Sequence, residues 1–256
     1  MKQYVLALAC ALGMAVPAAV TWASSTPGDR QSIERAAAIN TQLGLEYMKQ
    51  GNLEAARDKI EKALKQDPHT AETQMAAGFL YDRLGDDRKA ISHYDQAGKL
   101  GKDNPDIVNN VAVYLCRKGD RKRGEEYFLK AANNALYKTP DVAYTNAGRC
   151  ARADGRPKDA EQYFRKALTF RADQPDSLLQ LAELTHESGN NMQARAFLQR
   201  YFAVAPATAA TLLLGNRIER ALGDNAHAAE YANRLTSEFS SSLEAGLLLG
   251  EQSGKP

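Results

Sequence analysis

Cysteine and histidine are the residue types in this 256-residue chain that could carry the most specific chemistry. The three cysteines are Cys10, Cys116 and Cys150, and the last two lie 34 residues apart. In a chain sent to an oxidising compartment, an even pair of cysteines favours a disulfide. The alternative is two buried thiols that pack as small apolar side chains. Cys10 lies in an apolar N-terminal run and is not part of this pair.

No other motif in the chain predicts catalysis. The four histidines are isolated from one another and from the cysteines, so no metal site is expected. No glycine-rich phosphate loop and no nucleophile elbow is present, and the acidic pairs are typical of solvated helix surfaces. We therefore expect no enzyme activity, no cofactor and no small-molecule substrate. Lys and Arg (33) nearly balance Asp and Glu (31) and are interleaved with them, which argues against a nucleic-acid partner.

Six glycines recur at a nearly constant interval and indicate the elements that position these residues. The successive spacings are 34, 34, 36, 34 and 34 residues. A period of this length is typical of tetratricopeptide repeats, in which two helices and a tight turn form one unit that cannot bury its apolar face alone. The glycines are Gly51, Gly85, Gly119, Gly155, Gly189 and Gly223.

Small and large residues recur at fixed distances from these glycines. A small residue seven positions before the glycine and another five positions after it allow the two helix axes to approach to about 8–10 Å. A large apolar residue follows on the same face of the second helix. The first small position is occupied by Gly44, Gly78, Ala112, Gly148, Ala182 and, less well, Asn216, and the large one by Ile60, Tyr94, Phe128, Phe164 and Leu198.

The predicted fold is all-α: a right-handed superhelical solenoid of six helix-turn-helix repeats with a short C-terminal capping helix. The two extra residues in repeat three should lengthen the loop into repeat four, around 133–138. A closing helix over 243–249 should cover the last apolar face, with a frayed tail to 256. The expected repeats span 37–70, 71–104, 105–140, 141–174, 175–208 and 209–242, and the cap and tail span 243–256.

The N-terminus predicts export. Residues 1–23 combine an early lysine, a short apolar run broken by Pro17 and a small-residue pattern ending near Ala23, which is typical of a cleaved signal segment. An uncleaved membrane anchor and a cytoplasmic chain are the alternatives. Residues 24–36 are expected to hold a polar linker and the start of the first helix.

The predicted first helices place the cysteines and a binding surface. Cys116 and Cys150 differ in helical phase by two residues, so one can face forward along the stack and the other back, as a bridge between neighbouring helices requires. Other side chains of the first helices should line a concave groove for a bound peptide or helix. The groove residues predicted are Met48, Met75, Phe79, Asn109, Asn110, Val113, Asn146 and Arg149, followed in repeat five by Leu179, Gln180, Glu183 and His186.

Repeats three to five contain five distinctive runs, at 105–110, 114–116, 135–137, 146–152 and 178–184. Together these runs resemble a known family, the type IV pilus biogenesis and stability proteins. The resemblance extends from about Ile33 to Phe239, and its specific part includes the two-residue insertion and the Asn-Ala-Gly-Arg-Cys run that begins at Asn146.

The resemblance implies a six-repeat pilotin, an exported lipoprotein at the periplasmic face of the outer membrane. Such proteins bind the secretin subunit and promote its localisation and assembly into a multimeric pore. The two family cysteines match Cys116 and Cys150. The lipid acceptor is less clear: either Cys10 carries the lipid after an unusually short signal, or cleavage near Ala23 leaves a chain without lipid. The alternative function is a repeat-containing regulator of a peptidoglycan enzyme of the cell envelope, and a cytoplasmic chaperone adaptor is a more distant one.

Overall fold

The computed structural model describes residues 27–253, and this part of the chain consists of helices without strands. Successive helices form antiparallel pairs joined by tight turns. The bounds are α1 Pro27–Lys49, α2 Leu53–Gln66, α3 Ala71–Arg83, α4 Asp87–Leu100, α5 Pro105–Arg117, α6 Arg121–Ala132, α7 Pro140–Ala153, α8 Pro157–Phe170, α9 Pro175–Glu187, α10 Asn191–Phe202, α11 Ala209–Leu222, α12 Asn225–Glu238 and α13 Leu243–Ser253.

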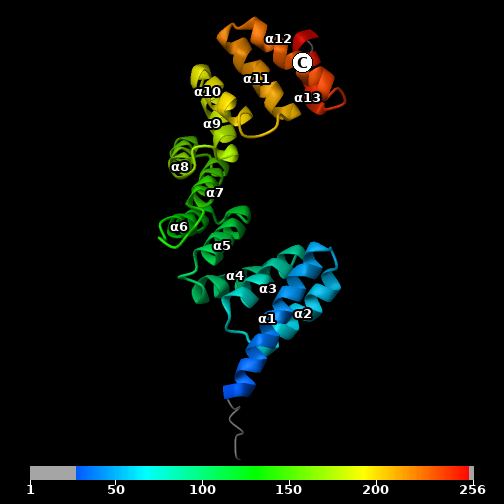
Figure 1. The fold of residues 1–256 in the computed structure, drawn as a ribbon, viewed down its shortest axis with the longest axis vertical. Helices are drawn as coiled ribbons and strands as arrows, with labels where there is room; N and C mark the ends of the chain where they lie inside the picture. The colour runs from blue at the N-terminus through cyan, green and yellow to red at the C-terminus, as the bar shows by residue number, and fades with distance from the viewer. Residues whose placement is uncertain (1–26, 254–256) are drawn as a thin grey trace, which may run out of the picture.

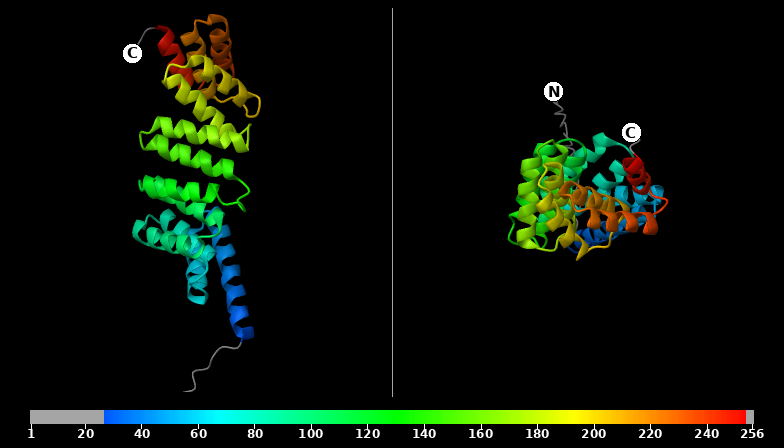
Figure 2. Two further views of the ribbon diagram at one scale, coloured as in Figure 1. Left: turned by 90° about the vertical axis from the view of Figure 1, so that its left-hand side faces the viewer. Right: turned by 90° about the horizontal axis from the view of Figure 1, so that it is seen from above.

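The pairs stack in chain order into an open, curved ribbon (Figure 1). The chain runs from α1 at the lower end to α13 at the upper end, and each pair rests on its neighbours, as two further views show (Figure 2). The predicted all-α superhelical solenoid is confirmed. No helix between residues 27 and 253 is long and apolar enough to cross a membrane.

The six periodic glycines make the turn inside each pair. All six have positive φ, from 72° at Gly155 to 93° at Gly119, a backbone conformation that residues with a Cβ rarely adopt. In five pairs the next residue caps the second helix by accepting a hydrogen bond from the backbone three residues later. These caps are Asn52, Asp86, Asp120, Asn190 and Asp224.

The small position of each first helix faces the large residue of the second, sixteen residues later. A Cβ added at Gly148 would lie 2.6 Å from the ring of Phe164, which is fully buried. At Gly78 the ring of Tyr94 would be 3.0 Å away. The glycine therefore sets the distance between the two helices.

Repeat six differs from the predicted register by one residue. Gly215, not Asn216, faces the large residue, because a Cβ there would lie 3.0 Å from the ring of Tyr231. Asn216 is buried beside it and donates a hydrogen bond of 2.7 Å to the backbone oxygen of Ala228. A polar side chain at the expected small position is thus accommodated by a local shift.

Both ends of the array have their own features. Helix α1 already begins at Pro27, so the expected polar linker within 24–36 is shorter than the sequence indicates. Helix α13 buries Ala245 and Leu248 against α11 and α12. The predicted signal segment 1–23, including Cys10, lies outside the described residues.

The loop between repeats three and four is longer than its equivalents, as the two extra residues predict. It spans 133–139, whereas the equivalent loops span 101–104 and 171–174.

A disulfide joins Cys116 on α5 to Cys150 on α7. Their Cα atoms are 5.8 Å apart, within the usual range for a disulfide. Cys150 is fully buried among Ala112, Phe128 and Ala147. The bond connects the first helices of repeats three and four.

Changing Gly148 to Val should destabilise the chain by about 1–3 kcal/mol, because Phe164 has no room to move away from the new methyl groups. Gly246→Val is the matched control, since a Cβ there meets nothing within 4 Å. The control should change stability by less than about 1 kcal/mol. Thermal unfolding followed by circular dichroism measures both, and equal midpoints for the two variants would show that the close approach is not limiting.

Replacing both Cys116 and Cys150 with Ala should cost about 3–4 kcal/mol, because the disulfide closes a loop over a sequence separation of 34 residues in the unfolded chain. Denaturant unfolding with and without reductant measures this loss. The reductant should lower the stability of the wild type and leave the double variant unchanged. Maleimide labelling of the denatured, non-reduced protein should label neither Cys116 nor Cys150, and labelling of both would contradict the bond.

Candidate functional site

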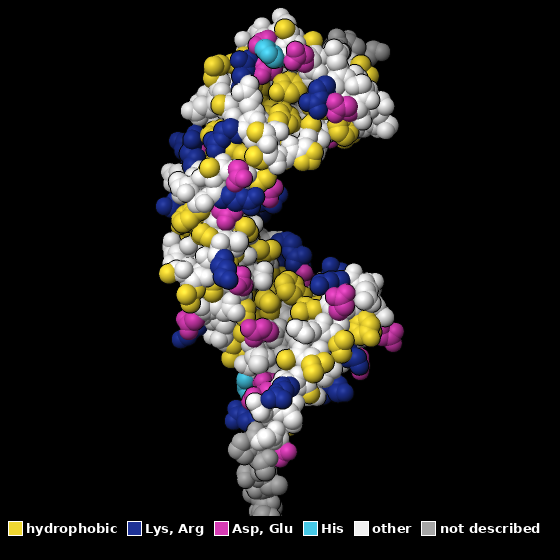
Figure 3. Space-filling model, viewed as in Figure 1, with side chains coloured by type: hydrophobic (Ala, Val, Ile, Leu, Met, Phe, Trp, Pro, Cys, Tyr) yellow, Lys and Arg dark blue, Asp and Glu magenta, His cyan; other side chains and the backbone are white. Residues whose placement is uncertain are grey.

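The first helices of the pairs line the concave surface of the solenoid, here called the groove. The space-filling view shows this face hollowed at mid-height between two arms (Figure 3). Hydrophobic side chains gather on both arms, and charged side chains lie between and around them.

One inner position of the first helix divides the groove into two halves. In repeats one to three this position is apolar, and in repeats four to six it is charged. Together with their neighbours, these residues define an apolar half on α1, α3 and α5 and a charged half on α7, α9 and α11. The residues at this position are Leu45, Phe79 and Val113, then Arg149, Glu183 and Arg217.

The apolar half contains two adjoining pockets between α1 and α3. One is lined mainly by apolar atoms, including Ala38, Leu45 and Met75. The other lies beside Leu45 and Phe79, with Arg83 at its edge. The ring of Phe79 is half-buried and packs edge-on against Tyr94, with ring centroids 5.7 Å apart, so its position is fixed by the core. A rigid apolar surface of this kind suits an apolar side chain of a bound polypeptide.

The predicted groove residues differ in how much surface they offer. Val113 is 41% exposed and Arg149 is exposed, and Met75, Phe79, Asn110 and Asn146 are half-buried. Met48 and Asn109 are only 5% and 8% exposed.

For Asn109 the predicted role as a contact residue is therefore corrected. Asn109 accepts a hydrogen bond of 3.5 Å from Asn146 and so connects α5 to α7. Met48 packs largely in the core of the first three repeats, but it also lines the pocket beside Leu45 and Phe79.

In the charged half, ion pairs connect neighbouring repeats. Arg152 on α7 reaches both Glu183 and Glu187 on α9, and also donates to Gln180 at 2.9 Å. Arg149 lies 3.7 Å from Asp176. These pairs are partly exposed, so they orient side chains more than they stabilise the fold.

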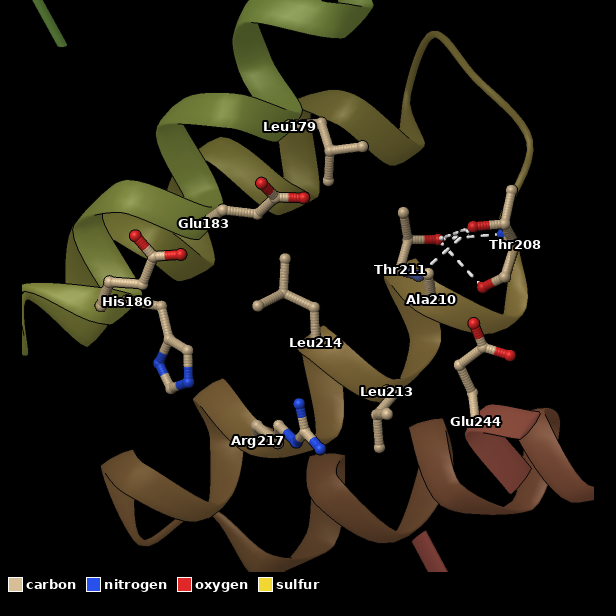
Figure 4. A pocket seen from close by; sticks show the side chains of 11 residues that line it. Leu179, Glu183, His186, Thr208, Ala210, Thr211, Leu213, Leu214, Arg217 and Glu244 are labelled. Carbon is tan, nitrogen blue, oxygen red and sulfur yellow. Dashed lines mark hydrogen bonds between the residues drawn. The ribbon is translucent and has the colours of Figure 1, made fainter. Parts of the chain in front are cut away.

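A pocket at the C-terminal end of the groove lies between α9, α11 and α13 (Figure 4). The predicted residues Leu179, Glu183 and His186 line it. The sequence argument missed its other walls, which come from repeat six and from Glu244 on the capping helix. The repeat register could have indicated Leu214 and Arg217, whereas the position of Glu244 depends on how α13 folds back.

The perturbed titratable groups have structural causes. Burial raises the pKa of the Tyr94 phenol and keeps it neutral, and burial lowers the pKa of His93, whose Nδ1 lies 2.7 Å from the amide oxygen of Gln74. Burial and the neighbouring carboxylate of Glu125 raise the pKa of Tyr163.

Among the described residues, no group of three or more His, Cys, Asp or Glu side chains could hold a metal ion. The geometry of the groove points to binding of a polypeptide.

Family models for the tetratricopeptide repeat match residues 41–105, 112–177 and 151–216. Among curated proteins, the type IV pilus assembly protein PilF of Pseudomonas aeruginosa is 29% identical over 206 residues, which cover 79% of this chain and 81% of PilF.

Two solved structures agree with this likeness over nearly their whole length. The structure from a functional characterisation of Pseudomonas aeruginosa PilF has a TM-score of 0.74 at 26% identity, and the comparison covers 86% of this chain and 99% of that one. PilW, described as a widely conserved type IV pilus biogenesis factor, has a TM-score of 0.73 at 32% identity, with 83% and 98% covered. The chain thus belongs to the tetratricopeptide repeat family and, within it, to the type IV pilus biogenesis proteins related to PilF and PilW.

Proposed function

We propose that this chain is a non-enzymatic periplasmic scaffold that binds the secretin subunit of the type IV pilus. In this role it promotes the localisation of the secretin to the outer membrane and its multimerisation. The family relationship supports a role in pilus assembly, and the export signal predicted over 1–23 supports the periplasm. The chain is held at the outer membrane either by a lipid on Cys10 or through the secretin itself.

The observation that carries this proposal is the apolar half of the groove. Leu45, Phe79 and Val113 occupy the same position on the first helices of three successive repeats, so they form a row along the groove. Met75 lies beside them, and its flexible thioether adapts to different partner shapes. A row of apolar side chains that remain partly exposed inside a concave surface is typical of a site for a protein partner.

Such a site suits a protein that binds the secretin subunit before the subunit multimerises. Permanent subunit interfaces are more apolar than ordinary protein surface, so a subunit that has not yet multimerised would present such a surface for the groove to cover and then release. This exchange needs an open surface and not a closed pocket, as the solenoid provides (Figure 3).

Phe79→Ala should weaken binding of the secretin subunit roughly tenfold or more, because it removes a rigid aromatic contact from the centre of the apolar row. Co-purification from detergent-solubilised envelopes, followed by mass spectrometry and a binding titration, measures the effect. Phe170→Ala is the matched control, since Phe170 is 51% exposed, lies at the end of α8 and does not line the pockets of the groove. Absence of secretin peptides from the wild-type sample would overturn the proposed partner.

Deletion of the gene should abolish surface pili and secretin multimers while cell shape stays normal. Immunoblots of unheated envelopes for the multimer, together with electron microscopy of the cells, provide the readout. The opposite result, altered cell shape with intact pili, would favour regulation of a peptidoglycan enzyme instead.

A further inference from the structure

The C-terminal pocket of the groove combines an apolar floor with an acidic rim (Figure 4). Its volume of about 360 Å³ lies at the small end of the range for ligand sites, so it has room for a side chain and not for a helix. Leu214 lies at its centre in the close-up view. The floor is formed by Leu179, Leu213 and Leu214, and the rim by Glu183, Glu187 and Glu244.

The rim carries more negative charge than its own arginines compensate. Glu183 and Glu187 share the single guanidinium group of Arg152. Glu244 has no hydrogen-bond or ion-pair partner for its carboxylate within residues 27–253.

The one arginine that lines the pocket, Arg217, is already engaged. It donates to Glu251 with an Nε–Oε1 distance of 3.0 Å, and Arg220, outside the pocket, lies 3.8 Å from the same carboxylate. Arg152, Arg217 and Arg220 thus pair with Glu183, Glu187 and Glu251, which leaves the charge of Glu244 uncompensated. His186 is held by Asn191, with 2.6 Å between Nδ1 and the amide oxygen.

We propose that this pocket receives a lysine or arginine side chain of the polypeptide that binds in the groove. The inference rests on the proposed function and adds a second, polar contact to the apolar one at α1 and α3. The aliphatic stem of the incoming side chain lies over the three leucines, and its cation reaches Glu244.

Other side chains fit the pocket less well. An acidic side chain is repelled by the rim, and a purely apolar one removes water from Glu244 without giving its carboxylate a partner. Because Glu244 belongs to α13, the capping helix contributes directly to the site besides covering the end of the core. A bound segment would thus be oriented in the groove by an apolar contact at one end and a cationic contact at the other.

Neutralising the rim tests the proposal. In a binding titration of the purified full chain against the secretin subunit, Glu244→Gln should weaken binding roughly tenfold, and Glu187→Gln together with Glu244→Gln should weaken it further. Glu230→Gln on α12 is the matched control, because Glu230 is exposed and lies outside the pocket, and it should leave the affinity unchanged. Raising the salt concentration should narrow the difference between wild type and variants.

A second arm does not depend on the secretin. A synthetic tetralysine peptide should shift the backbone amide NMR signals of Glu187 and Glu244 but not that of Glu230, and a tetraglutamate peptide should shift none of them.

Equal secretin affinities for the wild type and both rim variants, or tetralysine shifts spread evenly over the surface, would overturn the pocket assignment. A rim variant that instead changed the monomer–dimer equilibrium would also overturn it, since the occupant would then be a second copy of this chain. Failure of the wild type to bind secretin, with the lysine shifts confined to the pocket, would reject only the proposed partner.

Discussion

The close approach of the two helices in each pair is the constraint on which the rest of the structure depends. A glycine or alanine on the first helix lets the large side chain of the second helix lie directly against its backbone, as Gly148 and Phe164 show. The positive φ of the turn glycine reverses the chain over the shortest path. Each pair formed in this way leaves one apolar face exposed, so it must stack on its neighbours, and the curved groove follows from that stacking.

The sequence predicted this architecture well because a repeated constraint leaves a repeated signal. The turn glycines, the caps that follow them and the fillers such as Tyr94 are local features with a fixed spacing. The shift in repeat six could not be predicted this way, because the choice between Gly215 and Asn216 as the contact for Tyr231 depends on which side chain finds a hydrogen-bond partner.

The groove was predicted less completely than the fold. Helical phase alone placed Met48 and Asn109 at the surface, but the rotation of each pair relative to the next decides which inner residues are covered. That rotation depends on side-chain packing between repeats, which no short sequence pattern encodes. For the same reason the contribution of Glu244 was not foreseen, because it requires α13 to fold back against α11.

The disulfide lies at the border between the two halves of the groove. Cys116 belongs to α5, the last helix of the apolar half, and Cys150 to α7, the first helix of the charged half. The longer loop 133–139 crosses the same border, and its Tyr137 is buried in a core cluster with Val108 of α5 and Tyr144 of α7. Because each repeat contacts only its neighbours, the relative orientation of the two halves depends on this one interface. A covalent bond between α5 and α7 adds to this packing in fixing that orientation, so a partner that contacts both halves meets them at a defined distance.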